Sequence, residues 1–223
     1  MLEELREQVL KANLGLKENR LVKGTSGNAS EIDSRTGYVV IKPSGVDYDK
    51  MCAADLVAMD LNGKVIEGAL KPSVDWPHHL FLYKNLAGIG GVIHTHSTYA
   101  TAFAASGLSI PVHSTTHADV FGEEVRCAPY ADNKGDNIGK SILASKNSCN
   151  AILLEKHGVF TWGKNASEAL HYAIKVEEVA KISFLAMRLS HLAGARLEAM
   201  PSHEVEKWHA RYTTAYGQKK PTP

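Results

Sequence analysis

The pattern of apolar and polar positions predicts a helix at the start of the chain, followed by short strands. Apolar residues recur there at spacings of three and four, at Leu2, Leu5, Val9, Ala12 and Leu16. Two hairpins are predicted next, with strands at 29–32 and 38–41 and then at 56–61 and 64–67. The second hairpin turns at Asn62-Gly63, a pair that readily adopts the positive φ angles of a tight turn.

The second half of the chain combines buried strands with longer helices. A helix begins near Pro77, and the apolar run 91–93 leads as a strand into His94-Thr95-His96. A second buried strand, 149–154, ends just before His157, and a return strand follows at 158–162. Asn165 and Glu168 have the spacing of a capping box that opens a helix to about Leu192, and the segment from 202 on is weakly helical. Helices on a mostly antiparallel strand set predict one α/β or α+β layer domain.

Composition narrows the class of protein. The chain has 223 residues, 44% hydrophobic and 22% charged, with a formal net charge of +1, which suits one globular domain. With no basic excess and no charge run, we expect no nucleic-acid or membrane partner. The N-terminus lacks the apolar core of a signal peptide, and no stretch is apolar for long enough to span a bilayer. Cys52, Cys127 and Cys149 form no CxxC pair, which favours reduced thiols and a cytoplasmic location.

Three histidines carry the candidate chemistry. His94 and His96 point to the same face if they lie on a strand, and His157 also follows a buried strand. If these strand ends lie side by side, three imidazoles converge and leave an open coordination position, which is typical of a catalytic zinc site. Asp75 is a candidate fourth ligand. The alternative is that the histidines are only packed and hydrogen bonded.

Other enzymes with an HxH pair fit the sequence less well. A hydrolase of the HxHxDH type needs Asp and His soon after His96, where the chain has Ser97-Thr98-Tyr99. A cupin needs a glutamate a few residues downstream, where Ala100, Thr101 and Ala102 stand. A zinc amidohydrolase barrel usually needs about 250 residues, more than this chain has.

Three turn-rich segments suggest an anion site. The first contains Gly24, Gly27 and Asn28, the second contains Ser44-Gly45, and Ser73 lies in the third, while Lys42 supplies a positive charge. Glycines let backbone N–H groups approach an anion, and hydroxyl and amide side chains add donors. Each segment alone is an ordinary turn, so the prediction of a phosphate clamp rests on their coincidence with a metal site.

These motifs together resemble the class II aldolase and adducin family. The resemblance rests on GTSGNAS, IKPSGVDYDKM, KPSVDWPHH, GGVIHTHS, STTHAD, LLEKHGVFTWGKNASEA and the closing AYGQ. It spans residues 1–218 as a single domain, and we expect 219–223 to be a flexible tail. The resemblance implies a three-layer α/β fold, with a central mostly antiparallel sheet covered by helices. It also implies a homotetramer with active sites at subunit interfaces.

The resemblance also implies roles for particular residues. One Zn²⁺ per subunit would be held by His94, His96 and His157, with Asp75 in or beside the coordination shell. Substrate, chiefly its phosphate, would be bound by Gly27, Asn28, Lys42, Ser44, Gly45 and Ser73. Asp119 and Tyr216 match the two acid/base positions of the epimerase branch, with Tyr216 acting in a neighbouring subunit.

The epimerase branch interconverts L-ribulose 5-phosphate and D-xylulose 5-phosphate. Zinc would stabilise the enediolate formed by retro-aldol cleavage of the C3–C4 bond, and the aldehyde fragment would rotate before the bond reforms. Inversion requires acid/base groups on opposed faces, which suits Asp119 and Tyr216. Alternatively, Asp119 caps a helix and Tyr216 anchors the tail.

Some residues depart from the epimerase pattern. Val74 stands where a second serine is usual, and the CAPYAD stretch is more similar to the L-fuculose-phosphate aldolase branch. A sugar-phosphate aldolase is therefore the main alternative, and a non-catalytic adducin-like binding module is a further one. His117 is a candidate to orient Asp119. Some epimerases of the family use an assisting C-terminal histidine, and His203 and His209 are both candidates for that position. The remaining histidines, among them His78 and His79, are expected on helix faces or at the surface rather than as ligands.

Overall fold

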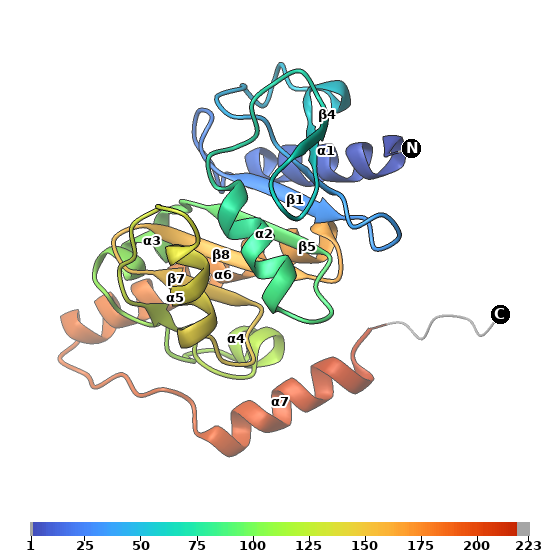
Figure 1. Cartoon of the computed structure of the whole chain (residues 1–223). Helices are drawn as coiled ribbons and strands as arrows, with labels where there is room; N and C mark the ends of the chain where they lie inside the picture. Colours follow the sequence, from blue (N-terminus) through green and yellow to red (C-terminus); the bar gives the residue numbers. More distant parts are fainter. Residues whose placement is uncertain (1, 218–223) are drawn as a thin grey trace.

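The computed structural model describes residues 2–217, whose strands form one sheet with helices on both sides (Figure 1). The tail expected to be flexible, 219–223, lies outside the described residues. The sheet has eight strands in the order β4-β3-β2-β1-β5-β8-β7-β6. Every neighbouring pair is antiparallel except β6 and β7, so the predicted mostly antiparallel sheet is confirmed.

The strands are short, and their bounds follow the predicted hairpins closely. They are β1 Asn28–Ile32, β2 Val39–Ile41, β3 Val57–Met59, β4 Val65–Glu67, β5 Gly91–Thr95, β6 Cys127–Ala128, β7 Ala151–Leu154 and β8 Gly158–Gly163. The helices are α1 Glu3–Glu18, α2 Trp76–Asn85, α3 Thr98–Ala105, α4 Thr115–Phe121, α5 Asn137–Ser145, α6 Ala166–Leu192 and α7 Ser202–Ala215, with a 3₁₀ turn at Ala53–Asp55.

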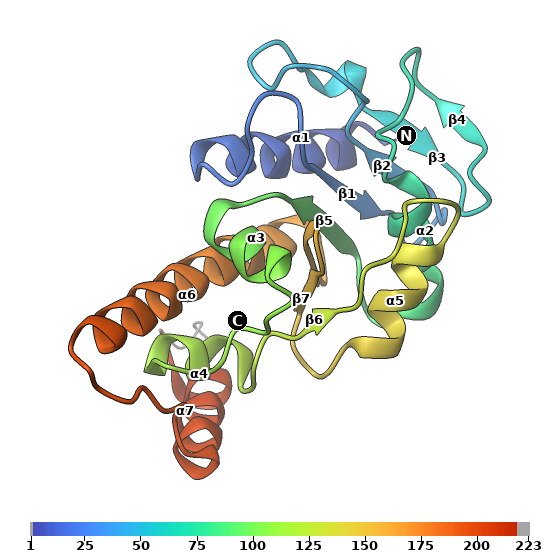
Figure 2. The same ribbon diagram turned by 90° about the vertical axis from the view of Figure 1, so that its left-hand side faces the viewer.

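The helices form two layers, one on each face of the sheet. Helices α1, α3, α4 and α6 pack on one face, whereas α2 and α5 pack on the other (Figures 1 and 2). Strand alternation divides the core accordingly, because Ile93 of β5 packs beneath α1 and α6 while its neighbour Val92 packs with α2 and α5. The predicted three-layer α/β fold is confirmed.

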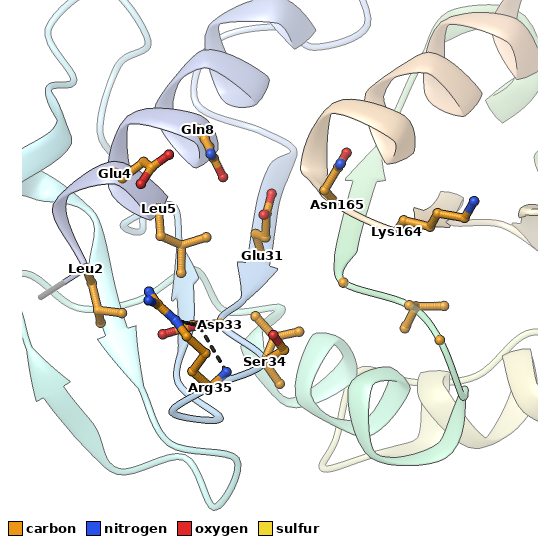
Figure 3. Close-up of a pocket in the computed structure, with 14 residues that line it drawn as sticks. Leu2, Glu4, Leu5, Gln8, Glu31, Asp33, Ser34, Arg35, Lys164 and Asn165 are labelled. Carbon is orange, nitrogen blue, oxygen red and sulfur yellow. Dashed lines mark hydrogen bonds and ion pairs between the residues drawn. The ribbon is translucent and has the colours of Figure 1, made fainter. Parts of the chain in front are cut away.

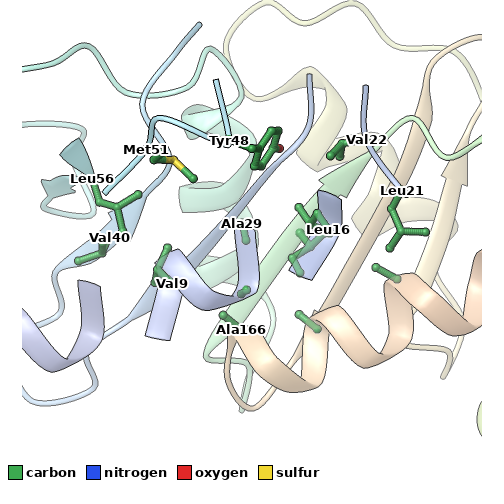
Figure 4. Packing of buried hydrophobic residues seen from close by; sticks show 14 of the residues in the cluster. Val9, Leu16, Leu21, Val22, Ala29, Val40, Tyr48, Met51, Leu56 and Ala166 are labelled. Carbon is green, nitrogen blue, oxygen red and sulfur yellow. The ribbon is translucent and has the colours of Figure 1, made fainter. Parts of the chain in front are cut away.

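The contact between α1 and the start of α6 closes the core over β1 and β2 (Figure 4). Val9 and Leu16 of α1 are fully buried there, against Ala29 and Val40 of the sheet. Burial of one such aliphatic side chain contributes about 1.5–3 kcal/mol. The apolar face predicted for the opening helix is therefore the face that anchors it.

Side chains cap α6 largely as predicted. Asn165 is the N-cap, and its Oδ1 accepts a hydrogen bond from the Glu168 amide at 2.8 Å. The Glu168 carboxylate reaches back one residue further than in a standard capping box, to the Lys164 amide. A buried carboxylate of the sheet adds to this cap, since Glu31 accepts from the Ala166 amide at 2.7 Å. The N-terminus of α6 is thus tied to β1 as well as to its own first turn.

The segment between β5 and β7 contains elements that the sequence pattern did not predict. Helices α3, α4 and α5 and the short strand β6 all lie there. Helix α4 is capped by Ser114, whose Oγ accepts from the His117 amide at 3.3 Å, and Asp119 lies within the helix. The alternative that Asp119 is a helix N-cap is therefore wrong.

Helix α7 lies outside the two layers and packs on α4 (Figure 2). A small apolar cluster joins them, with Val205 of α7 against Val112 and Ala118. The weakly helical pattern predicted from residue 202 is thus a complete helix held by tertiary contacts. Within residues 2–217, every helix is too short or too polar to cross a membrane.

The cap of α6 generates a stability prediction. Replacing Asn165 by alanine removes the acceptor of the Glu168 amide, and we expect the free energy of unfolding to fall by about 1 kcal/mol. Urea denaturation measures this change. Ser167→Ala, at an exposed position in the same helical turn, is the matched control and should change the free energy by less than about 0.5 kcal/mol. Equal effects of the two substitutions would contradict the capping role.

Candidate functional site

Strand pairing brings the three predicted histidines together. In the β5–β8 pair His94 lies opposite Phe160 and Thr95 opposite Val159, so the β7–β8 turn that carries His157 lies beside the end of β5. The ring centroids of His94 are 4.8 Å from those of both His96 and His157. Those of His96 and His157 are 5.2 Å apart. The predicted convergence of strand ends is confirmed.

Hydrogen bonding sets the tautomer of the innermost histidine. His94 Nδ1 lies 2.9 Å from the Val159 carbonyl oxygen, which can only accept, so Nδ1 carries the proton. Its Nε2 is then a lone-pair donor, and it faces His96 Nε2 at 3.0 Å. Two ring nitrogens this close require a proton or a cation between them. One ligand atom from each of the three residues lies within 4.8 Å of the others, so the cluster could hold a metal ion.

The three histidines differ in solvent exposure. His94 is 2% exposed, His157 is half-buried and His96 is exposed. Burial lowers the pKa of His94 to about 3 and also lowers the pKa values of His96 and His157. At neutral pH the rings are therefore neutral, which is the form that binds metals. The exposed side leaves room for a further ligand.

Asp75 lies beside this cluster at the N-cap position of α2. Its Oδ2 accepts from Asn28 Nδ2 at 2.6 Å and lies 3.4 Å from Ser73 Oγ. Asn28, which donates to Asp75, lies opposite His94 in the β1–β5 pair. The negative charge of Asp75 favours the protonated form of each of the three clustered histidines and so opposes the lowering of their pKa values by burial. Burial opposes ionisation of Asp75, whereas the facing rings of His94 and His79 and the Asn28 hydrogen bond hold its pKa below the ordinary value.

A glycine permits the close approach of the histidine rings. A Cβ atom on Gly158 would lie 2.5 Å from the Thr95 carbonyl oxygen and 2.6 Å from Cδ2 of His96. Two residues before Gly158, Lys156 adopts a left-handed conformation with φ of 57° to complete the tight β7–β8 turn. The turn can therefore present His157 only if its next residue has no side chain.

The three turn-rich segments predicted to bind an anion also meet. The Ser44 amide donates to the Lys71 carbonyl at 2.9 Å, and the Ser73 amide donates to the Lys42 carbonyl at 2.9 Å. Lys42 is 1% exposed and its Nζ donates to the Thr25 carbonyl at 3.1 Å. Burial lowers the pKa of Lys42, an effect that the charges of Asp47 and Asp75 oppose.

The residues of these segments differ in accessibility. Ser44 and Gly45 are exposed, whereas Asn28 and Ser73 are buried next to Asp75. Gly27 has φ of 77°, and a Cβ there would lie 2.5 Å from Val22. Hydrogen bonds thus join the three segments into one wall of turns, which reaches the histidines where Asn28 lies opposite His94.

Asp119 and Tyr216 belong to helix α4 and to the end of helix α7, away from the turn segments described above. Asp119 is half-buried on α4, and its carbonyl accepts from His209 Nδ1 at 2.9 Å. Tyr216 follows α7, is 64% exposed and stacks on Tyr212 at 5.0 Å. Among residues 2–217, no hydrogen bond or ring contact joins either residue to the three histidines.

His117 and the two candidate C-terminal histidines make different contacts. His117 is fully buried, and its Nε2 donates to the Glu123 carbonyl at 3.0 Å rather than to Asp119. His203 is exposed near Glu204, so it is His209 that contacts Asp119, through the backbone.

Sequence reasoning missed the polar residues beneath the site. His78 and His79 lie on helix α2, in agreement with the predicted helix-face position, and both are completely buried. His79 Nδ1 lies 2.7 Å from Ser30 Oγ, while neither ring nitrogen of His78 has a partner among the described residues. Their position three and four residues after Asp75, in the first turn of α2, was the available signal in the sequence. Nothing in the sequence indicated that Phe160 would stack on His94, with 4.5 Å between the ring centroids.

A separate hollow of about 610 Å³ lies at the opposite end of β1 (Figure 3). Glu31 and Arg35 from the end of β1 and its turn line it, together with Gln8 of α1 and Asn165 at the start of α6. Glu31 lies opposite Gly91 in the sheet, whereas Asn28 lies opposite His94, so β1 separates this hollow from the histidines.

The sequence and the fold match those of known proteins. The "Class II Aldolase and Adducin N-terminal domain" family matches residues 7–184. A solved L-fuculose 1-phosphate aldolase is 32% identical, with a TM-score of 0.83, and the match covers 94% of this chain and 96% of that one. The chain therefore belongs to the class II aldolase and adducin family.

More distant structures share the fold. The L-fuculose-1-phosphate aldolase of Thermus thermophilus is 24% identical with a TM-score of 0.71, covering 86% of this chain and 98% of that one. The L-fuculose 1-phosphate aldolase from Glaciozyma antarctica is 19% identical with a TM-score of 0.79, covering 94% and 81%.

The tight β7–β8 turn generates a prediction about metal binding. Gly158→Ala forces a methyl group against His96 and the Thr95 carbonyl, so we expect zinc affinity to fall about tenfold or more. Competition against a chromophoric zinc chelator measures this. Gly37→Ala is the control, since it strains the β1–β2 turn, where φ is 71°, away from the histidines. Unchanged zinc affinity in Gly158→Ala would show that the rings do not need this close packing.

Proposed function

We propose that the protein is a zinc-dependent epimerase that interconverts L-ribulose 5-phosphate and D-xylulose 5-phosphate by cleaving and reforming the C3–C4 bond. The observation that carries this proposal is the three-histidine cluster with Asp75 beside it, bordered by the wall of turns that contains Lys42. The shared fold and family support a sugar-phosphate enzyme.

His94, His96 and His157 would hold one Zn²⁺ per subunit. A bound zinc ion would act as a Lewis acid toward the oxygen on which negative charge develops when the carbon–carbon bond breaks. His94 is suited to bind the metal because its hydrogen bond to the Val159 carbonyl keeps the proton on Nδ1 and leaves the lone pair of Nε2 for coordination. Asp75 would lie in or beside the coordination shell and balance the charge of the ion.

The wall of turns would bind the substrate phosphate. Ser44 and Gly45 offer exposed groups, and Gly27 allows the backbone to approach an anion closely. The Lys42 ammonium supplies the positive charge, at present directed to backbone carbonyls. Asn28 and Ser73 border the same wall, hydrogen bonded to each other at 2.9 Å. Retention of the phosphate would keep the aldehyde fragment bound while it rotates.

Asp119 and Tyr216 would transfer protons on opposed faces of that fragment. Inversion demands this pair, because the C4 oxygen loses a proton on one side and regains it on the other. Tyr216, which is 64% exposed, would act in the site of a neighbouring subunit, within a homotetramer whose sites lie at subunit interfaces. The three free cysteines suit a cytoplasmic location.

A sugar-phosphate aldolase is the second candidate. It is favoured by the 32% identity to an L-fuculose 1-phosphate aldolase over 94% of this chain. Such an enzyme would use the same histidines and the same wall of turns, and it would release the aldehyde instead of turning it. An adducin-like module without catalysis is opposed by the complete histidine cluster.

Two substrates separate the candidates. We expect the zinc-loaded protein to convert L-ribulose 5-phosphate to D-xylulose 5-phosphate, since both acid/base residues are present. A coupled assay for D-xylulose 5-phosphate measures this. If that product is absent and dihydroxyacetone phosphate is released from L-fuculose 1-phosphate, the protein is an aldolase.

The acid/base pair generates its own prediction. Asp119→Asn and Tyr216→Phe should each lower kcat for epimerisation by about 100-fold or more, because a positioned acid or base contributes that much. Zinc content should stay at the wild-type level, which metal analysis checks. His96→Ala is the comparison and should lose zinc and activity together. Loss of zinc from either acid/base variant would contradict the assigned role.

A further inference from the structure

A carboxylate of α6 caps helix α3, which begins just after the histidine pair of β5. The Tyr99 amide donates to Glu177 Oε1 at 2.9 Å and to Oε2 at 3.1 Å, and the Ala100 amide donates to Oε2 at 2.9 Å. These amides belong to the first turn of α3, where a helix has no internal acceptors for its N–H groups. A negative charge there also interacts favourably with the helix dipole. Glu177 thus fixes the first turn of α3, although 78 residues separate it from Tyr99 in the chain.

The residue at the N-cap of α3, Ser97, does not supply this cap itself. Serine is a preferred N-cap residue, yet the Ser97 side chain makes no capping bond, and its Oγ is buried without a partner among the described residues. Helix α6 also holds the ring of Tyr99, which lies 5.7 Å from Lys181 Nζ and 5.7 Å from the ring of Phe184, measured from its centroid. Glu177, Lys181 and Phe184 have the four- and three-residue spacing of one helix face. The start of α3 is therefore anchored from α6.

His96 lies between this anchored turn and the end of β5. Strand β5 ends at the residue before His96, and α3 begins two residues after it. The ring of His94 is oriented by the Val159 carbonyl, which accepts from Nδ1. Within residues 2–217, the ring of His96 has no such bond to a protein oxygen, and its polar contact is with His94 Nε2. The position of the His96 ring therefore depends on its backbone, which the sheet holds on one side and Glu177 on the other.

We infer, resting on the zinc site of the function proposed above, that Glu177 is a positioning residue, which holds His96 in place for the metal by fixing the turn that follows it. Without the carboxylate, the amides of Tyr99 and Ala100 lose their acceptors, so the first turn of α3 shifts toward other partners. His96 precedes Tyr99 by three residues and shifts with that turn, whereas His94 keeps its place in the sheet. One ligand of three is thus displaced.

The zinc affinities of two Glu177 variants test this inference, measured by chelator competition on the full chain at a temperature where each variant is folded. Glu177→Ala should weaken zinc binding about tenfold, as loss of a contact that supports a metal ligand typically does. Glu177→Gln should stay within about threefold of wild type, because its amide oxygen has two lone pairs for the same two backbone amides. Equal losses in both variants would mean that the charge of Glu177 matters and its hold on α3 does not, which would overturn the inference.

Two neighbouring positions on α6 supply matched controls. Val176 is buried in the same apolar cluster as Ala100 of α3, so Val176→Ala should lower Tm by several degrees. Its zinc affinity should stay within about twofold of wild type, because the cap of α3 is intact. Glu178→Ala removes an exposed charge that is paired with Lys175 at 2.7 Å and should leave zinc affinity unchanged. Similar losses of zinc affinity in Val176→Ala and Glu177→Ala would make Glu177 a general stabilising contact and refute the positioning role.

Bound Co²⁺ gives a second readout, which a loss of stability alone does not change. The visible absorption of Co²⁺ depends on the number and geometry of its ligands. The Co²⁺-loaded Glu177→Ala protein should therefore have an altered spectrum, whereas Co²⁺-loaded Val176→Ala should have the spectrum of wild type. An unchanged spectrum in Glu177→Ala would show that His96 has not moved, and the inference would be wrong.

Folding and the wider proposal are controlled separately. If Glu177→Ala fails to fold, Glu177→Met replaces it, because methionine fills a similar volume and has no oxygen acceptor. A wild-type protein that binds no zinc would overturn both the inference and the proposed function. A wild-type protein that binds zinc but converts neither L-ribulose 5-phosphate nor L-fuculose 1-phosphate would overturn the proposed function alone, and the affinity comparison would still decide the role of Glu177.

Discussion

The antiparallel register of β5 between β1 and β8 is the constraint on which the candidate site depends. It places Asn28, His94 and Phe160 side by side across three strands, on the face that α2 covers. Because side chains alternate along a strand, a slip by one residue would turn His94 toward α6 and bring Ile93 beneath α2. The apolar alternation of the core therefore sets the geometry of the polar site.

The same arrangement makes the histidines unequal. The Phe160 ring stacks on His94, and the backbone at Gly158 can approach His94 closely because this residue has no side chain. His96, in contrast, lies just past the end of β5 and is exposed. Burial on one side of the three histidines favours neutral imidazoles, and exposure on the other side leaves a coordination position that a substrate can reach. Asp75, at the N-cap of α2, supplies a negative charge that would compensate the charge of a bound metal ion. The sheet and the helix layer that contains α2 therefore both contribute to the site.

Local patterns were sufficient to predict the sheet hairpins, the capped α6 and the convergence of His94, His96 and His157. Each depends on period-two alternation or on a cap that acts within four residues. Helices α3 and α4 escaped prediction because they are short and their helicity rests on burial against α6. The burial of His78 and the internal bonds of Asn28 were equally hidden, since both depend on neighbours more than 40 residues away in the chain.

Under the proposed function, the residues for carbon–carbon bond cleavage and those for inversion lie on different elements of the fold. The residues for bond cleavage lie on the sheet and α2, whereas Asp119 lies on α4 and Tyr216 follows α7, which packs on α4. The bond between His209 and the Asp119 carbonyl and the packing of His209 over Gly122 join these two helices. Variation in the α4–α7 unit could therefore alter proton transfer while the metal site stays unchanged. Such a division would allow one family to contain both aldolases and epimerases.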